Sequence, residues 1–259
     1  MNGELDGDLI RRLAAEKGCR YEIECVEQTD STNNVLKQLA VNGAEHGKLL
    51  IAGSQTAGRG RLGRSFFSPD SGIYMSLLLR PSTSPDKTLF FTTAAAVAVC
   101  RAIENTTELT AGIKWVNDIY IGEKKVCGIL TEAAIEGGVT GWAVVGIGVN
   151  IAHPQNGFPG EIADRACALF DGKAPCGFRE RFAAELAVQL YRIYSTDEFM
   201  SVEEYRRRSV LIGRILTAYG AGGEEQCRAV GIDDSAALLV EYPDGTAGRL
   251  ISGEVSIRL

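Results

Sequence analysis

Residues 48–64 read KLLIAGSQTAGRGRLGR, an apolar run followed without a break by a segment rich in glycine and arginine. The composition of residues 48–56 is that of a buried strand. The segment after it contains Gly58-x-Gly60-x-x-Gly63, the pattern of dinucleotide-binding loops. That pattern requires a helix directly after the third glycine, because the helix N-terminus holds the pyrophosphate. Here RSFFSPDSG follows, without helical periodicity, so a doubly wound dinucleotide-binding fold is excluded.

The same segment carries Arg59, Arg61 and Arg64 in a chain of 259 residues whose formal net charge is −6. Glycines let backbone N–H groups approach an anion, and guanidinium groups donate forked hydrogen bonds that fit phosphate or carboxylate. Taken alone, the segment fits either a mobile surface loop or a loop that wraps a small anion. The Walker A sequence and the Gly-x-Ser-x-Gly elbow of hydrolases are both absent, which excludes those two site types.

The bulk composition, 45% apolar and 23% charged residues, is typical of a globular protein. No apolar run is long enough to predict a membrane span, and the acidic start of the chain does not resemble a secretion signal. Seven scattered cysteines and only two histidines, His46 and His153, argue against a disulfide framework and a zinc site. We therefore expect a cytoplasmic protein, and its acidic balance argues against general nucleic-acid binding.

The hydrophobic pattern changes near residue 210. Before it, the patterns predict a mixture of strands and helices, including a buried Ala-rich helix over residues 88–106 and two strands within 113–138, joined at Gly122-Glu123. After it, five short strand patterns are separated by Gly, Asp and Pro, which predicts a small β-barrel resting on the larger domain. We expect a domain of residues 1–209 and a barrel of residues 210–259.

Further segments carry polar and charged residues in a specific order. They are DSTN (30–33), KWVND (114–118), KKVCGIL (124–130) and GIGVN (146–150). With SQTAGRGRLGR (54–64), they resemble the biotin protein ligases, or biotin–[acetyl-CoA-carboxylase] ligases. The C-terminal SGEVSIR (252–258) resembles the small barrel of that family, and the resemblance covers roughly residues 20–259.

The resemblance implies an α+β fold with a mixed β-sheet and packed helices, like that of class II synthetases and biotin–lipoate ligases, plus a C-terminal SH3-like β-barrel. It implies that the carboxylate of biotin attacks the α-phosphate of ATP, supplied with Mg²⁺, to give biotinyl-5′-AMP and pyrophosphate. A lysine of a biotin carboxyl carrier domain of a carboxylase then attacks the acyl carbon, and AMP leaves. Both a monomer and a homodimer joined edge to edge through the central sheet are compatible with it.

The resemblance also implies roles for individual residues, while metal ligands stay unassigned. The catalytic residues would be Arg61, Lys114, Asp118 and Lys125. Biotin would contact Ser31, Thr32, Asn33, Gln55, Gly58, Arg59, Lys125, Gly128, Leu130 and Gly146. ATP and the adenylate would contact Arg59, Arg61, Arg64, Phe66, Lys114, Asn117, Asp118 and Asn150. Gly148, like Gly146, would allow the ligand to come close to its strand.

Several of these assignments leave alternatives open. Ser31 and Thr32 also fit the cap of a helix. Asp118, expected to pair with Lys114, could orient Arg61, bind a metal or help to deprotonate the incoming lysine. Trp115 and Trp142 are expected in the core, because large aromatic side chains mostly serve packing.

Two positions depart from the family pattern: Val116 replaces a proline, and Phe66 replaces a tryptophan that stacks on adenine. The first change should loosen a turn, and the second should reduce stacking area. The glycine- and arginine-rich loop is expected to close over the adenylate and exclude water. About 20 residues precede the first expected strand, too few for a helix-turn-helix, so no repressor activity is expected.

Three alternative functions conflict with the sequence. Lipoate–protein ligases would show a different glycine motif and an adjacent His-Asp, and neither is present. A biotin-sensing DNA-binding module conflicts with the acidic balance. A binding protein that has lost catalysis conflicts with the intact Lys114, Asp118, Lys125 and loop arginines.

Overall fold

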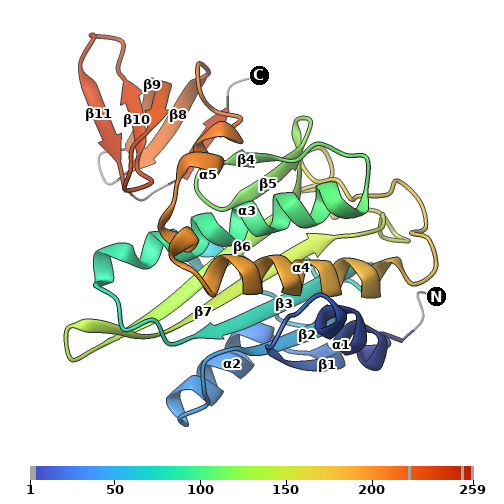
Figure 1. Cartoon of the computed structure of the whole chain (residues 1–259). Helices are drawn as coiled ribbons and strands as arrows, with labels where there is room; N and C mark the ends of the chain where they lie inside the picture. Colours follow the sequence, from blue (N-terminus) through green and yellow to red (C-terminus); the bar gives the residue numbers. More distant parts are fainter. Residues whose placement is uncertain (1–3, 221–222, 252–253, 258–259) are drawn as a thin grey trace.

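The computed structural model describes residues 4–220, 223–251 and 254–257, which build two separate sheets (Figure 1). The larger sheet has seven strands in the order β1-β2-β3-β7-β6-β5-β4. The β1–β2 pair is parallel and the other neighbours are antiparallel, so the sheet is mixed, as expected. Its strands are β1 (Glu22–Thr29), β2 (Lys48–Gln55), β3 (Gly72–Leu79), β4 (Gly112–Lys114), β5 (Asp118–Ile121), β6 (Lys124–Glu136) and β7 (Val139–Asn150).

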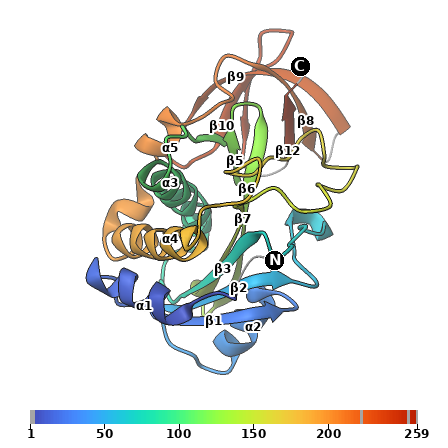
Figure 2. The ribbon, with the colours of Figure 1, turned by 90° about the vertical axis from the view of Figure 1, so that its right-hand side faces the viewer.

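Helices cover both faces of this sheet, with α1, α3 and α4 on one face (Figure 2). Strand alternation divides the core accordingly, because neighbouring side chains point to opposite faces. Leu77 and Leu79 of β3 belong to the large cluster with these three helices, whereas Leu78 packs with Leu36 of α2 on the other face. The helices are α1 (Gly7–Glu16), α2 (Thr32–Val41), α3 (Thr88–Thr106), α4 (Phe178–Tyr194) and α5 (Glu203–Arg207), with short 3₁₀ turns η1 (Arg61–Gly63), η2 (Pro85–Lys87) and η3 (Asp197–Met200).

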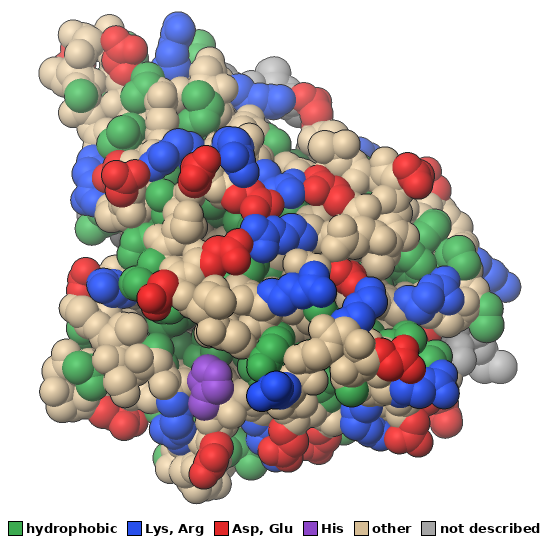
Figure 3. Space-filling model, viewed as in Figure 1, with side chains coloured by type: hydrophobic (Ala, Val, Ile, Leu, Met, Phe, Trp, Pro, Cys, Tyr) green, Lys and Arg blue, Asp and Glu red, His purple; other side chains and the backbone are tan. Residues whose placement is uncertain are grey.

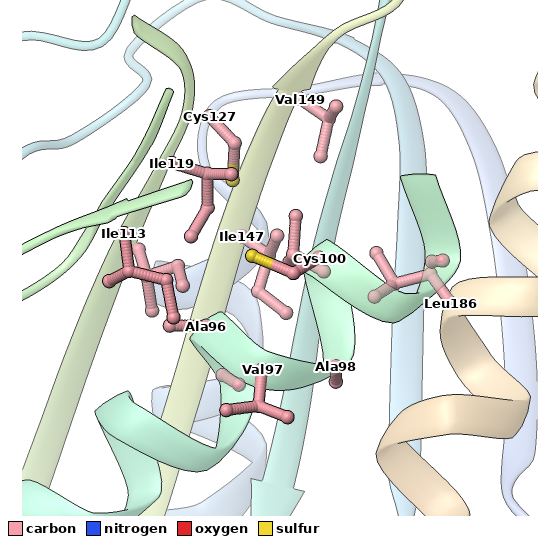
Figure 4. Packing of buried hydrophobic residues seen from close by; sticks show 14 of the residues in the cluster. Ala96, Val97, Ala98, Cys100, Ile113, Ile119, Cys127, Ile147, Val149 and Leu186 are labelled. Carbon is pink, nitrogen blue, oxygen red and sulfur yellow. The ribbon is translucent and has the colours of Figure 1, made fainter. Parts of the chain in front are cut away.

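Most of helix α3 lies within the large cluster, and its run of alanines lets the helix pack close to the sheet. Ala96 and Ala98 are fully buried, and such small side chains let the helix approach the strands closely. Figure 4 shows Ala96 and Cys100 of α3 beside Ile113 and Ile147 of the sheet. The predicted buried helix over residues 88–106 is confirmed.

The second sheet contains five antiparallel strands in the order β11-β10-β9-β8-β12. This sheet is consistent with the expected small SH3-like barrel, and the α+β fold class is confirmed. Ser252, Gly253 and Arg258 of the SGEVSIR segment lie outside the described residues. The strands are β8 (Ile215–Gly220), β9 (Gly223–Ile232), β10 (Leu238–Glu241), β11 (Ala247–Leu250) and β12 (Glu254–Ile257).

The prediction of two strands within residues 113–138 is wrong, because the KWVND segment divides the first of them into β4 and β5. Asn117 leaves the β4–β5 pairing and bonds to β6 instead, through its backbone oxygen with Ile129 N (2.9 Å) and its Nδ2 with Ile129 O (2.7 Å). Trp115 is buried, and its Nε1 donates to the carbonyl of Ala236 (2.9 Å), which ties this segment to the second sheet. Both tryptophans lie in the core, as predicted.

Surface charges of the two signs are interspersed over the face seen in Figure 3. Among the described residues, Arg101 and Arg208 form a charged network with Glu104, Glu198 and Glu204. No helix in the described part of the chain combines the length and the apolar character needed to span a membrane.

Candidate active site

A cleft of about 850 Å³, open mouth included, lies where α2, β2 and the strands β5, β6 and β7 meet the loop of residues 58–66, called the arginine loop below. Most of the residues selected from the sequence line it, although they come from distant parts of the chain. The lining residues are Ser31, Thr32, Asn33, Gln55, Arg59, Gly60, Arg61, Leu62, Arg64, Ser65, Phe66, Asn117, Asp118, Lys125, Gly128, Ile129, Leu130, Gly146, Ile147 and Gly148.

The N-terminus of α2 supplies a polar wall. Thr32 donates through its backbone N (2.9 Å) and its Oγ1 (3.1 Å) to Gln55 Oε1, and Gln55 Nε2 donates to Ser68 Oγ (3.1 Å). Ser31 is the N-cap residue, as predicted, but its side chain makes no capping hydrogen bond. Its buried side chain makes no hydrogen bond to the described residues, which leaves the hydroxyl available to a ligand.

Asn33 connects this wall to β3 and β6. Its Oδ1 lies 2.6 Å from Ser76 Oγ, and its Nδ2 donates to the carbonyl of Leu130 (3.2 Å) and to Glu132 Oε2 (3.0 Å). A Cβ on Gly146 would lie 1.9 Å from Asn33 Oδ1. The close approach that Gly146 permits in this structure is therefore that of a protein side chain.

The arginine loop folds back on itself at its base. Phe66 N donates to the carbonyl of Gly58 (2.9 Å), and Gly60 N donates to the carbonyl of Arg64 (2.8 Å). A Cβ on Gly58 would come within 2.4 Å of Ser68 Oγ, and Gly63 has a φ of +74°, so both positions require glycine for local reasons. These two glycines therefore shape the base and the turn of the loop.

The loop arginines are held by residues of other elements. Arg59 Nη1 donates to Asn34 Oδ1 (3.0 Å) and to both carboxylate oxygens of Glu132 (3.0 and 3.2 Å). Arg61 Nη1 donates to Asn117 Oδ1 (2.9 Å), the residue that is itself bound to β6. Two contacts therefore fix the loop over the cleft.

Lys125 and Asp118 form an ion pair inside the cleft, with 2.6 Å between Nζ and Oδ1. The pair expected from the sequence was Lys114–Asp118. The register does place Lys114 opposite Asp118, but Lys114 Nζ lies over the Tyr120 ring, 5.7 Å from its centroid, and Lys114 does not line the cleft. Burial, followed by the charge of Asp118, raises the pKa of Tyr120 to about 12, so its hydroxyl stays protonated at neutral pH.

Phe66 covers a floor formed by two glycines. A Cβ on Gly148 would lie 2.5 Å from the ring and one on Gly128 2.9 Å from it, so side chains at these positions would displace the ring. Lys125 Nζ lies 5.9 Å from the ring centroid, a cation–π distance. The aromatic ring and the charged pair are thus neighbours in the cleft.

Three residues that were expected to contact the ligands do not line the cleft, and several other residues do. Gly58, Lys114 and Asn150 do not line it, and Asn150 Nδ2 donates to the carbonyl of Cys167 (2.9 Å). The lining residues Leu62, Ser65, Ile129 and Ile147 were not expected from the sequence, and Gly60 was expected only as a glycine of the loop. Sequence reasoning also missed Asn34 and Glu132, whose only sequence signal is their position beside the quoted segments.

Comparisons with known proteins agree with the fold. The model of the biotin/lipoate A/B protein ligase family matches residues 25–150. The chain is 37% identical over 220 residues to the bifunctional ligase/repressor BirA of Bacillus subtilis, covering 83% of this chain and 68% of the relative. It is 30% identical over 240 residues to the biotin–[acetyl-CoA-carboxylase] ligase of Mycobacterium tuberculosis, covering 88% and 86%. The solved biotin protein ligase from Aquifex aeolicus in complex with biotin and ATP has a TM-score of 0.73 and 29% identity, covering 91% of this chain and 98% of that chain.

Proposed function

Because the chain belongs to the biotin/lipoate A/B protein ligase family, we propose that it is a biotin protein ligase. It joins biotin to a specific lysine of a biotin carboxyl carrier domain of a carboxylase, in two steps that consume ATP and pass through biotinyl-5′-AMP. The observation that carries this proposal is the convergence of Arg59, Arg61 and Lys125 on one cleft that also has a neutral polar wall.

In the first step, the carboxylate of biotin attacks the α-phosphorus of ATP and pyrophosphate leaves. Two anions must approach each other, so fixed positive charge lowers the barrier. Lys125 supplies a cation that Asp118 holds in place, and Arg59 and Arg61 supply cations from the arginine loop. The polar wall of Ser31, with Thr32 behind it, offers hydrogen bonds to the ureido group of biotin.

Mg²⁺ enters with ATP as part of the substrate. Within the described residues, no three His, Cys, Asp or Glu side chains lie close enough together to hold a metal ion. Asp118 is the one carboxylate among the residues that line the cleft, and its Lys125 partner already balances its charge. Since Mg²⁺ in nucleotide sites relies on phosphate oxygens and water with one or two carboxylates, this residue set fits an ion that arrives with the nucleotide.

In the second step, the amine of the carrier lysine attacks the acyl carbon of the mixed anhydride, and AMP leaves with the bonding electron pair. The adenylate must be kept from water until the carrier docks. The arginine loop does this by lying over the cleft, tied down through Arg59 and Arg61. Phe66 stacks on the adenine ring, which covers the nucleotide from the same side.

The test is pyrophosphate release by the purified chain, with ATP and either biotin or lipoate. Biotin-dependent release, followed by a gain of one biotinyl group in the mass of a biotin carboxyl carrier domain, is expected. A carrier domain whose target lysine is replaced by arginine serves as the control and should gain no mass. Release with lipoate and not with biotin would refute the proposal while leaving the family assignment intact.

A further inference from the structure

A half-buried carboxylate beside the cleft binds the first arginine of the arginine loop. Glu132 lies on β6, with 22% of its side chain exposed, and does not line the cleft itself. It accepts hydrogen bonds from Arg59 Nη1 (3.0 and 3.2 Å), Lys37 Nζ (2.7 Å) and Asn33 Nδ2 (3.0 Å). None of the chemical steps above requires this residue, so its three donors call for a separate explanation.

The contacts of Arg59 are confined to one corner of its guanidinium group. Nη1 donates to Glu132 and to Asn34 Oδ1, whereas Nη2 and Nε make no hydrogen bond to the described residues. Arg59 lines the cleft, so the group is anchored on one side while two of its nitrogens stay available to an anion. Anchoring matters because a long side chain otherwise loses rotamer freedom when it binds a ligand.

The charges of the cluster support this arrangement. Burial alone would raise the pKa of Glu132, but hydrogen bonds from Lys37 and Asn33 and the charges of Lys37 and Arg59 outweigh burial and lower it. Glu132 is therefore ionised at neutral pH and can hold a guanidinium. Two cations share one carboxylate, so the cluster keeps a positive charge for an incoming anion.

The same carboxylate is linked to the polar wall. Asn33 bonds to Glu132 through Nδ2, while its Oδ1 lies 2.6 Å from Ser76 Oγ, which in turn lies 2.7 Å from Thr32 Oγ1. One continuous network thus runs from the wall at α2 to the arginine loop, and Glu132 is the member at which loop and wall meet.

We propose that Glu132 is a positioning residue, which holds Arg59 at the cleft in the orientation that receives the carboxylate of biotin. This inference rests on the proposed function, since an anchored guanidinium at this place requires an anionic substrate. Glu132 acts through Arg59 and touches no reacting atom.

The test compares Glu132→Gln with Glu136→Gln, a matched substitution at an exposed position of the same strand. Glutamine keeps the shape and removes the charge. We expect Glu132→Gln to raise KM for biotin about fivefold, the effect of weakening one charge-assisted pair that is partly open to water, and to change KM for ATP by less than about twofold. Glu136→Gln should behave like the unmodified chain.

A double-substitution cycle separates positioning from structural support. If Glu132 acts through Arg59, Glu132→Gln should have no further effect on KM for biotin in an Arg59→Ala background. A Glu132→Gln effect of equal size in both backgrounds would overturn the proposal, as would a KM for biotin that Glu132→Gln leaves unchanged.

Trypsin gives a readout that does not need activity, because the arginine loop offers, besides the bond after Arg59 itself, cleavage sites after Arg61 and Arg64. Without any ligand, Glu132→Gln should speed cleavage at these two sites several-fold, and Glu136→Gln should not. Equal cleavage rates in all forms would contradict the anchor. If the unmodified chain releases no pyrophosphate with biotin, the proposed function fails, and the trypsin comparison still decides whether Glu132 holds Arg59.

Discussion

Replacing Lys125 with alanine should lower kcat/KM for biotin in the adenylation step by about 10²–10³-fold, the usual cost of removing one preorganised charge donor. The structure gives two reasons. Lys125 Nζ lies in the cleft, 2.6 Å from Asp118 Oδ1, so it is held in place before any ligand arrives. Its loss also leaves the Asp118 carboxylate unbalanced beside two anionic substrates.

Coulomb attraction between the Lys125 ammonium and an anionic substrate has the same magnitude. The Lys125 side chain is 32% exposed, so the effective dielectric is closer to that of a protein surface than to that of a dry interior. At a dielectric constant of about 20, unit charges about 4 Å apart interact by about 4 kcal/mol, which corresponds to about 10³-fold and sets the upper end of the range.

The assay is biotin-dependent pyrophosphate release under initial-rate conditions, with thermal unfolding to verify that each variant is folded. Lys124→Ala is the matched control, because Lys124 is the adjacent lysine, is exposed and does not line the cleft. It should retain activity within about twofold of the unmodified chain. A Lys125→Ala variant that is folded and active within about threefold of the unmodified chain would refute the reasoning.

Three further predictions concern the arginine loop, the packing of Gly146 against Asn33, and DNA binding. Arg61→Gly removes the hydrogen bond to Asn117 and should let activated biotin escape and label lysines of bystander proteins. An unchanged ratio of carrier labelling to bystander labelling would count against a loop that retains the adenylate. Gly146→Ala places a Cβ against Asn33 and should lower the free energy of unfolding in urea by about 2–4 kcal/mol. The control Gly160→Ala adds a Cβ in open space and should leave that free energy unchanged. Equal urea midpoints for the two variants would contradict this prediction. Because its formal net charge is −6, the chain should not shift promoter DNA even with biotin and ATP, and a sequence-specific shift would contradict this.

Much of the fold could be predicted because local patterns and tertiary packing agree. The Ala-rich helix over residues 88–106 and the apolar strand that ends before the arginine loop both satisfy local propensity and burial at once. The strand break at residues 115–117 could not be predicted, because it depends on Asn117 bonding to Ile129, twelve residues away, and on Trp115 reaching Ala236.

Part of the site could also be predicted, because some of its residues stand in recognisable sequence segments. Arg59, Arg61 and Lys125 stand in recognisable segments, and the fold brings those segments to one cleft. Glu132 has no such signal, since its contact with Arg59 spans 73 residues of sequence and arises only from the pairing of distant strands. The ion pair of Lys125 with Asp118 has no sequence signal either, because it arises from the pairing of β5 with β6.

The central claim is that cations from the arginine loop and from β6 meet on one acyl-adenylate. Its most direct test is a crystal structure of the chain with biotinyl-5′-AMP. We expect the phosphate and the acyl oxygen within hydrogen-bonding distance of Lys125 Nζ and of the guanidinium groups of Arg59 or Arg61. An adenylate bound away from these three side chains would contradict the account.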